Sequence, residues 1–144
     1  MKTKLDIKDS VFGAFDGTTS VLGIILTVGL THSHALLLAA VGLAISSAVG
    51  MAGGEWLSDN GKSRTAAITI GIATAVGTLL PVLPFILLSG PLAIICGLLV
   101  LLAVGAGIAV VRGNTVRTWV QTFLILGIAA GASGLAAIIL GGGG

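Results

Sequence analysis

Long apolar runs, separated by short polar segments, make up this chain. Five runs are long enough to cross a bilayer as helices, because a lipid core of about 30 Å needs about 20 mostly apolar residues. They are residues 10–30, 36–57, 65–88, 91–111 and 117–140. The segments between them are short, which makes sequential helices antiparallel neighbours. The pattern predicts an all-α, integral membrane five-helix bundle, with residues 1–144 as a single transmembrane domain.

The composition supports this pattern. Of the 144 residues, 56% are hydrophobic and only 8% are charged, and the mean hydropathy is +1.17. A soluble domain of this size has too little interior to bury so much apolar surface. The first run is not interpreted as a cleaved signal peptide, because it carries an aspartate in its middle and lacks a convincing small-residue cleavage site.

The basic residues occur on alternate sides of the predicted spans. They precede the first run, or lie between the second and third or the fourth and fifth: Lys2, Lys4, Lys8, Lys62, Arg64, Arg112 and Arg117. Loops rich in Lys and Arg stay on the cytoplasmic side of a membrane. We therefore expect a cytoplasmic N-terminus and a C-terminus on the opposite side. Trp56 and Trp119 fall at predicted cytoplasmic helix ends, where indole rings favour the headgroup level.

Two carboxylates, Asp16 and Glu55, lie within predicted spans. A charged residue inside a membrane helix costs about 3 kcal/mol on insertion scales, so such a residue indicates a functional site by default. The alternative is that these acids are neutralised or reach the interface, and this alternative is stronger for the shallower Glu55.

Met51 precedes Glu55 by four residues, so the two side chains share a helix face. Because the first two helices run in opposite directions, Met51 and Asp16 are expected at similar depth, and they would meet if these helices pack through their glycines. Carboxylate oxygens suit Mn²⁺ and Fe²⁺, and a thioether adds affinity for softer transition metals. The alternative is that Met51 only fills space, as methionines in membrane helices often do.

Three motifs carry a family resemblance. They are "VFGAFDGTTSVLGIIL" in the first span, "SSAVGMAGGEWLS" in the second and "GTLLPVLPFIL" in the third. Their sequence and order resemble the vacuolar iron transporter family. The resemblance implies a transporter that moves Fe²⁺ or Mn²⁺ out of the cytoplasm by proton antiport, with the metal as substrate and no other cofactor. It also implies a homodimer whose ion path lies near the two-fold axis, with Asp16, Met51 and Glu55 as metal-contacting residues.

The chain departs from that family in two places. Many members carry a glutamate-rich cytosolic domain between the second and third helices, where this chain has only "SDNGKSR". Plant members have a further acid in the second helix where this chain has Leu43. The alternative function is therefore a non-transporting membrane scaffold or regulatory subunit that retains the fold.

Further expectations concern packing and location. The face formed by Gly13, Asp16, Gly17 and Ser20 predicts that the first helix lies at the two-fold axis of a dimer. Pro81 and Pro84 each lack a backbone N–H and should kink the third helix.

His32 and His34 are interpreted as an ordinary polar loop, dispensable for transport, with metal binding at the exit as the alternative. The chain has no phosphate loop, nucleophile–base set or Cys/His zinc cluster, so we expect neither an enzyme nor a nucleic-acid partner. We expect a bacterial plasma membrane, from the compactness of the chain.

Overall fold

Helices form every regular element of the described part of the chain, residues 2–28 and 33–141 of a computed structural model. They are α1 (Lys2–Val28), α2 (Ser33–Ser58), α3 (Arg64–Leu79), the 3-10 turn η1 (Leu80–Val82), α4 (Pro84–Leu87), α5 (Gly90–Val111) and α6 (Val116–Gly141). Within the described residues, five stretches are long and apolar enough to span a membrane: Ile7–Thr27, His34–Ser58, Arg64–Leu87, Gly90–Val111 and Val116–Leu140. The prediction of five helices long and apolar enough to span a membrane is confirmed within the described residues, and residues 29 and 30 of the first predicted run lie outside them.

The first helix begins at Lys2, well before residue 10 where its apolar run was expected to start. A helix closes its hydrogen bonds within its own backbone, so polar residues can extend it beyond the apolar stretch. The consequence is that Asp9 lies inside α1 and inside the apolar span that begins at Ile7.

The third span is broken near one end, as its two prolines predicted. α3 ends at Leu79, the chain makes the 3-10 turn η1 around Pro81, and α4 starts at Pro84. Each proline removes a backbone donor, so a continuous ladder of hydrogen bonds cannot pass this point.

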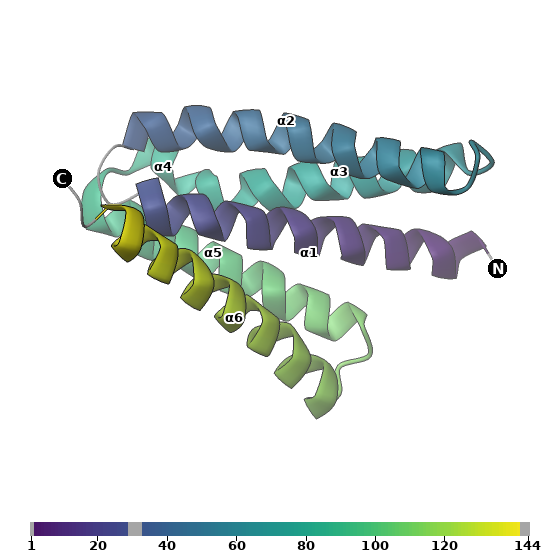
Figure 1. Ribbon diagram of the computed structural model, residues 1–144. Coiled ribbons are helices and arrows are strands. Elements are labelled where there is room, and N and C mark those ends of the chain that lie inside the picture. Colours follow the sequence, from purple (N-terminus) through teal and green to yellow (C-terminus); the bar gives the residue numbers. More distant parts are fainter. Residues whose placement is uncertain (1, 29–32, 142–144) are drawn as a thin grey trace.

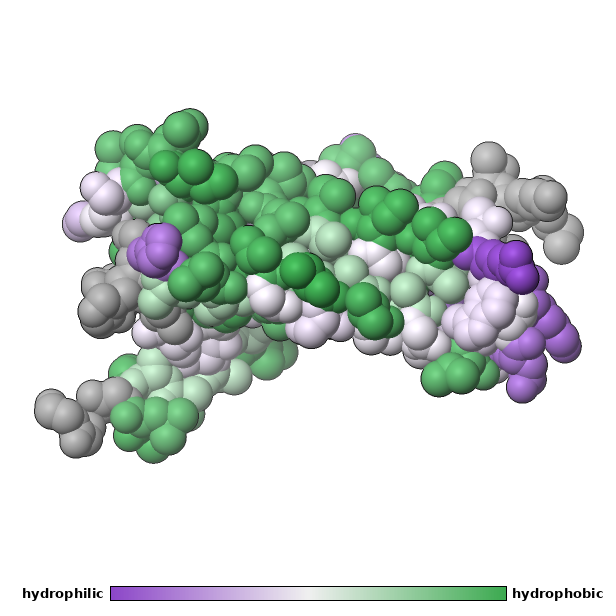
Figure 2. Space-filling view, turned by 90° about the horizontal axis from the view of Figure 1, so that it is seen from above, coloured by the Kyte–Doolittle hydropathy of each residue, from purple (hydrophilic) through white to green (hydrophobic). Residues whose placement is uncertain are grey.

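The long helices run side by side, with α1 between the α2–α3 pair and the α5–α6 pair (Figure 1). The N-terminus and the connections at residues 59–63 and 112–115 lie toward the same end of the bundle, which we call the basic end (Figure 1). Hydrophilic residues gather at this end, and the flank seen in Figure 2 is largely hydrophobic.

Glycines bring α1 and α3 into very close contact. A Cβ built on Gly17 would lie 2.2 Å from the carbonyl oxygen of Thr74, and one on Gly77 would lie 2.3 Å from the carbonyl oxygen of Ala14. The single O–H donor of Thr18 is shared between the carbonyl oxygens of Ala14 (2.6 Å) and, across the interface, Gly77 (3.4 Å). In lipid, close backbone approach of this kind replaces hydrophobic association as the source of packing.

In the half of the bundle away from the basic end, apolar side chains from five elements pack together. The buried members of this cluster are Val21, Ile25, Leu36, Ala40, Val82, Phe85 and Ala93. The interrupted third span takes part through η1 and α4, so the proline break positions Val82 and Phe85 against α1, α2 and α5.

Candidate functional site

A cavity of about 600 Å³ lies at the basic end and is lined by residues of five helices. Its lining includes four charged side chains, Lys8, Asp9, Glu55 and Arg112, among apolar ones such as Phe12. Asp9 and Lys8 come from α1, Glu55 from the end of α2, and Arg112 from the residue that caps α5. Two carboxylates from separate helices therefore share one cavity.

Both acids are half-buried, and Asp9 has one oxygen that is closed off from solvent. Its Oδ2 atom is buried and has no hydrogen-bond partner within the described part of the chain. A buried carboxylate oxygen without a partner is costly, and native structures usually satisfy it with a donor, a water molecule or an ion. Because Asp9 lines the cavity while its Oδ2 is buried, this oxygen could contact an entering cation only after a shift of the side chain.

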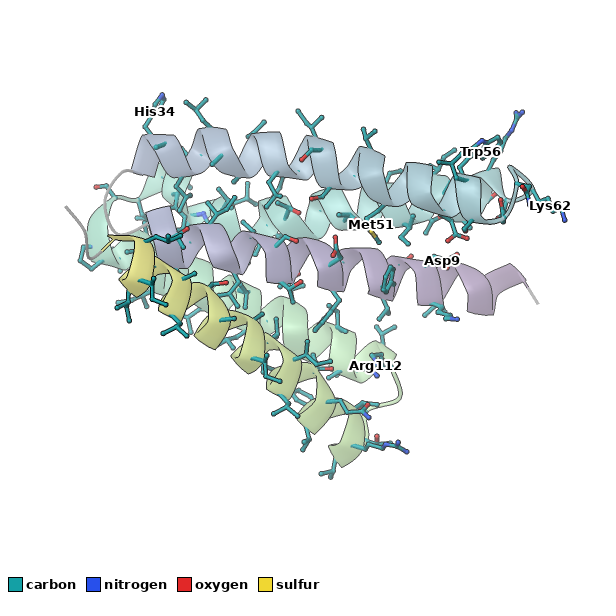
Figure 3. All side chains as sticks on the ribbon, in the orientation of Figure 1. Asp9, His34, Met51, Trp56, Lys62 and Arg112 are labelled. Atoms are coloured by element: carbon teal, nitrogen blue, oxygen red, sulfur yellow. The ribbon has the colours of Figure 1, made fainter. Side chains whose placement is uncertain are left out.

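Arg112 limits the negative charge of the cavity. Its guanidinium donates to the hydroxyl of Thr122 (3.3 Å) and to Oε1 of Gln121 (3.2 Å), which holds it against α6. The lining holds two basic residues, Lys8 and Arg112, and two acidic ones, Asp9 and Glu55, so its formal charges balance. Figure 3 shows Asp9 and Arg112 in the half of the bundle that ends at Lys62, with His34 at the other end.

Asp16 lies deeper than the cavity residues. It follows Ile7, the start of the span, by nine residues, which is about 14 Å along a helix that rises 1.5 Å per residue. The whole span of 21 residues covers about 32 Å, so Asp16 is near its middle. The side chain is half-buried, and Asp16 does not line the cavity at the basic end.

Met51 and Glu55 lie at different depths on α2. Counted back from Ser58, Glu55 is about 5 Å and Met51 about 10 Å into the span. Both side chains are half-buried, and Figure 3 places Met51 farther than Asp9 from the Lys62 end. Glu55 lines the cavity, whereas Met51 does not.

Glycine packing between the first two helices, the condition for Asp16 and Met51 to meet, is not found for the glycines near Met51. Cβ atoms built on Gly50, Gly53 and Gly54 would meet nothing within 4 Å, so these glycines do not bind α2 to α1. α2 instead packs closely on α3, where a Cβ on Gly71 would lie 3.0 Å from the carbonyl oxygen of Ala48. α1 and α2 do touch, but not through these three glycines.

The expected dimer face of α1 also needs correction. Gly13 and Gly17 are buried against α3 of the same chain, so they cannot meet a second copy. The uncovered part of α1 is the neighbouring strip that contains Phe12, which is 59% exposed, and the half-buried Asp16 and Thr19. A helix can bury only one side through glycines, and α3 occupies that side.

The described residues contain no group of three or more His, Cys, Asp or Glu side chains arranged to hold a metal ion. His34 is exposed at the end of the bundle opposite to Lys62 (Figure 3), and His32 lies outside the described residues.

Sequence reasoning missed Asp9 and Arg112 as candidate site residues. The predicted first span begins at residue 10 and so leaves Asp9 out, and Arg112 enters that prediction only among the basic residues that indicate orientation. A signal for Asp9 was present, because it precedes Asp16 by seven residues, or two helical turns, and so shares its face. No local signal indicated that Arg112 turns into a cavity.

The chain has no significant match among protein-family models, curated proteins or solved structures. The fold and the site by themselves define a class: an all-α integral membrane protein with a charged cavity at one end of its bundle.

Proposed function

We propose that this protein is a divalent transition-metal transporter that moves Fe²⁺ or Mn²⁺ out of the cytoplasm in exchange for protons. In this proposal Asp16, Met51 and Glu55 contact the metal, and Asp9 joins Glu55 at the entrance. The basic end faces the cytoplasm, in agreement with the bias of Lys and Arg toward that side. A bacterial plasma membrane is the proposed location.

One observation supports the proposal above the others: carboxylates occur at successive depths on one face of α1. Asp9 lines the entrance cavity with Glu55, and Asp16 follows two turns, or about 10 Å, deeper on the same helix face. Ionisable residues inside a membrane are rare and mark ion pathways and proton relays. Between the two levels Met51 offers a thioether from α2.

The residues suggest a sequence of events. A hydrated cation enters the cavity and exchanges part of its water for the carboxylates of Asp9 and Glu55, which are hard oxygen ligands. The cation then moves deeper, to Met51 and Asp16. There the carboxylate of Asp16 supplies negative charge and the thioether of Met51 supplies a softer contact. A proton that travels the other way can neutralise Asp16 after the metal leaves.

The proposal also includes a homodimer. A carboxylate near the middle of a span is costly against lipid. A second copy that covers the strip of α1 around Asp16 would shield it and would bring two Asp16 side chains to one axis.

The decisive experiment measures metal entry into liposomes that contain the purified protein, a trapped metal-quenched dye and an acidic lumen. We expect wild-type uptake of Fe²⁺, under reducing conditions, and of Mn²⁺. Asp16→Asn should abolish uptake of both, because it keeps size and hydrogen bonding but removes the charge. Asp59→Asn is the matched control: Asp59 lies at the basic end outside the cavity and accepts backbone hydrogen bonds from Lys62 and Ser63.

Normal uptake by the Asp16→Asn protein would refute the assigned path. Absence of uptake by folded wild-type protein, with any of the divalent metals and with either direction of the proton gradient, would favour the scaffold function instead.

A further inference from the structure

A second hollow lies on the outer surface of the bundle, between the basic ends of α2 and α3. This groove has a volume of about 540 Å³ and is lined mainly by apolar side chains. Its rims include Val49 and Ile68, which are 67% and 59% exposed, and small residues such as Gly53 and Ala67 form its depth. A Cβ on Gly53 would meet nothing within 4 Å, so this glycine leaves space instead of packing against a helix.

The positively charged side chain of Arg64 lies at the polar end of this groove. The guanidinium carbon of Arg64 lies 5.6 Å from the centroid of the Trp56 ring, and both residues line the groove. The stacking holds the guanidinium in place and leaves its planar set of N–H donors available. Within the described part of the chain, the Arg64 side chain has no hydrogen-bonded partner.

The charges around Arg64 favour an anion. Lys62 is exposed two residues away, and the acid of this turn, Asp59, is already engaged. Its carboxylate accepts hydrogen bonds from the backbone N–H groups of Lys62 (3.0 Å) and Ser63 (2.6 Å). The turn therefore carries two cations and one carboxylate, and the neighbouring Glu55 lines the other cavity instead of this groove.

The depth of the groove matches a lipid. The second span ends at Ser58 and the third begins at Arg64, so Arg64 is at the level where apolar spans end and headgroups begin. Below it the groove runs along the apolar flank of the bundle. A single molecule with a phosphate headgroup and a hydrocarbon tail can contact both the guanidinium of Arg64 and the apolar groove.

We propose that this groove is a binding site for an anionic phospholipid, with an acyl chain over Gly53 and the headgroup phosphate on Arg64. Arg pairs with phosphate in a bidentate geometry, and each basic residue near an anionic surface adds to lipid attraction. The proposal does not depend on metal transport.

The test uses Trp56 as the reporter. In a Trp119→Phe protein Trp56 is the one remaining tryptophan of the chain. The protein is placed in phosphatidylcholine bilayers that contain increasing fractions of brominated phosphatidylglycerol or brominated phosphatidylcholine, and quenching of Trp56 gives the relative binding constant. We expect phosphatidylglycerol to be preferred about fivefold, the effect of one basic residue near an anionic headgroup.

Two variants separate the charge from the groove. Arg64→Gln should bring the preference close to unity, whereas Arg117→Gln, an exposed arginine at the same end of the bundle, should leave it unchanged. Gly53→Leu should also remove the preference by filling the groove while Arg64 remains. Gly50→Leu, another α2 glycine with open space around it but outside the groove, is its control.

Equal quenching by the two brominated lipids would overturn the proposal. A preference for phosphatidylglycerol that survives Gly53→Leu would also overturn it, because it would show attraction to surface charge without binding of an acyl chain in the groove. Weak quenching by both lipids together with a disulfide between Gly53→Cys chains would assign the groove to a second copy instead.

Discussion

Asp16 lies near the middle of the α1 span, where a carboxylate has a high free-energy cost. Its half-buried side chain lies on a strip of α1 that the other helices of the chain leave partly uncovered. The structure provides no cluster of acids around it within the described residues. In the proposed transport, Asp16 is therefore one ligand among several, completed by another copy or by a methionine, and not part of a closed metal cage.

Met51 can be tested without disturbing packing. Met51→Leu keeps the apolar volume and removes the sulfur, an exchange that usually costs less than about 1.5 kcal/mol. If the thioether contacts the metal, uptake of Fe²⁺, Co²⁺ or Zn²⁺ should fall more than uptake of Mn²⁺, because the harder ion depends less on sulfur. Side-by-side uptake in liposomes at a fixed proton gradient measures this. Equal losses for every metal would remove the ligand role, and unchanged uptake would leave Met51 as a packing residue.

Asp9 and Glu55, the acids at the proposed entrance, should affect the capture of the metal ion. Asp9→Asn and Glu55→Gln each remove one carboxylate from a lining that also holds two cations, so the cavity becomes net positive and repels a divalent ion. We expect the metal concentration for half-maximal uptake to rise several-fold for each variant, with a smaller change in the maximal rate. The Asp59→Asn protein serves again as the control. A loss of maximal rate as complete as that of Asp16→Asn would move Asp9 or Glu55 from the entrance to the path itself.

At the scale of the helices, the α1–α3 interface is the part of the bundle least able to accept added atoms. Its glycines face backbone atoms, which cannot rotate aside as the end of a side chain can. α6 differs: its glycines 127, 131 and 134 meet nothing within 4 Å. The same residue type therefore serves close contact on one helix and leaves open surface on another.

Gly17→Ala tests this interface with the smallest possible addition. The new Cβ would lie 2.2 Å from the Thr74 carbonyl oxygen, so α1 and α3 must separate. We expect a destabilisation of about 1–3 kcal/mol, the usual cost of overpacking. Gly50→Ala is the matched control, and should be neutral or slightly stabilising because alanine is the better helix former. Unfolding in detergent, followed by circular dichroism, measures both; equal midpoints would contradict the close contact.

At the scale of the whole molecule, α1 is covered unevenly. Near the end away from the basic loops α6 crosses it, so that a Cβ on Gly23 would lie 3.2 Å from the Ser133 hydroxyl. Toward the basic end α6 diverges from α1 (Figure 1), and Phe12 is left exposed. The proposed dimer would cover this stretch.

Cysteine crosslinking in bilayers tests that dimer. The native Cys96 is first replaced by alanine, since it is the one cysteine of the chain. Phe12→Cys and Thr19→Cys should then crosslink between copies, because both lie on the uncovered strip. Val21→Cys should not, because Val21 is 0% exposed within its own chain. Failure of both strip positions to crosslink, with a monomeric mass in mild detergent, would contradict the dimer.

The number of membrane helices, their approximate limits and the gathering of basic residues at alternate connections could be predicted from the sequence. Each depends on local properties: the length of an apolar run against the thickness of a bilayer, and the type of residue in a short loop. The break at Pro81 and Pro84 was predictable for the same reason, because the missing N–H belongs to the residue itself. Asp16 was recognisable as unusual from its position in a run alone.

Only the tertiary structure decided which helix each glycine meets and which charges share a cavity. Gly17 and Gly50 look alike in sequence, yet one is pressed against α3 and the other faces open space. Asp9, Glu55 and Arg112 are far apart in the chain and line one cavity because α1 begins, and α2 and α5 end, at the same side of the bundle. Helix packing depends on how all the helix surfaces fit together, and no single segment contains that information.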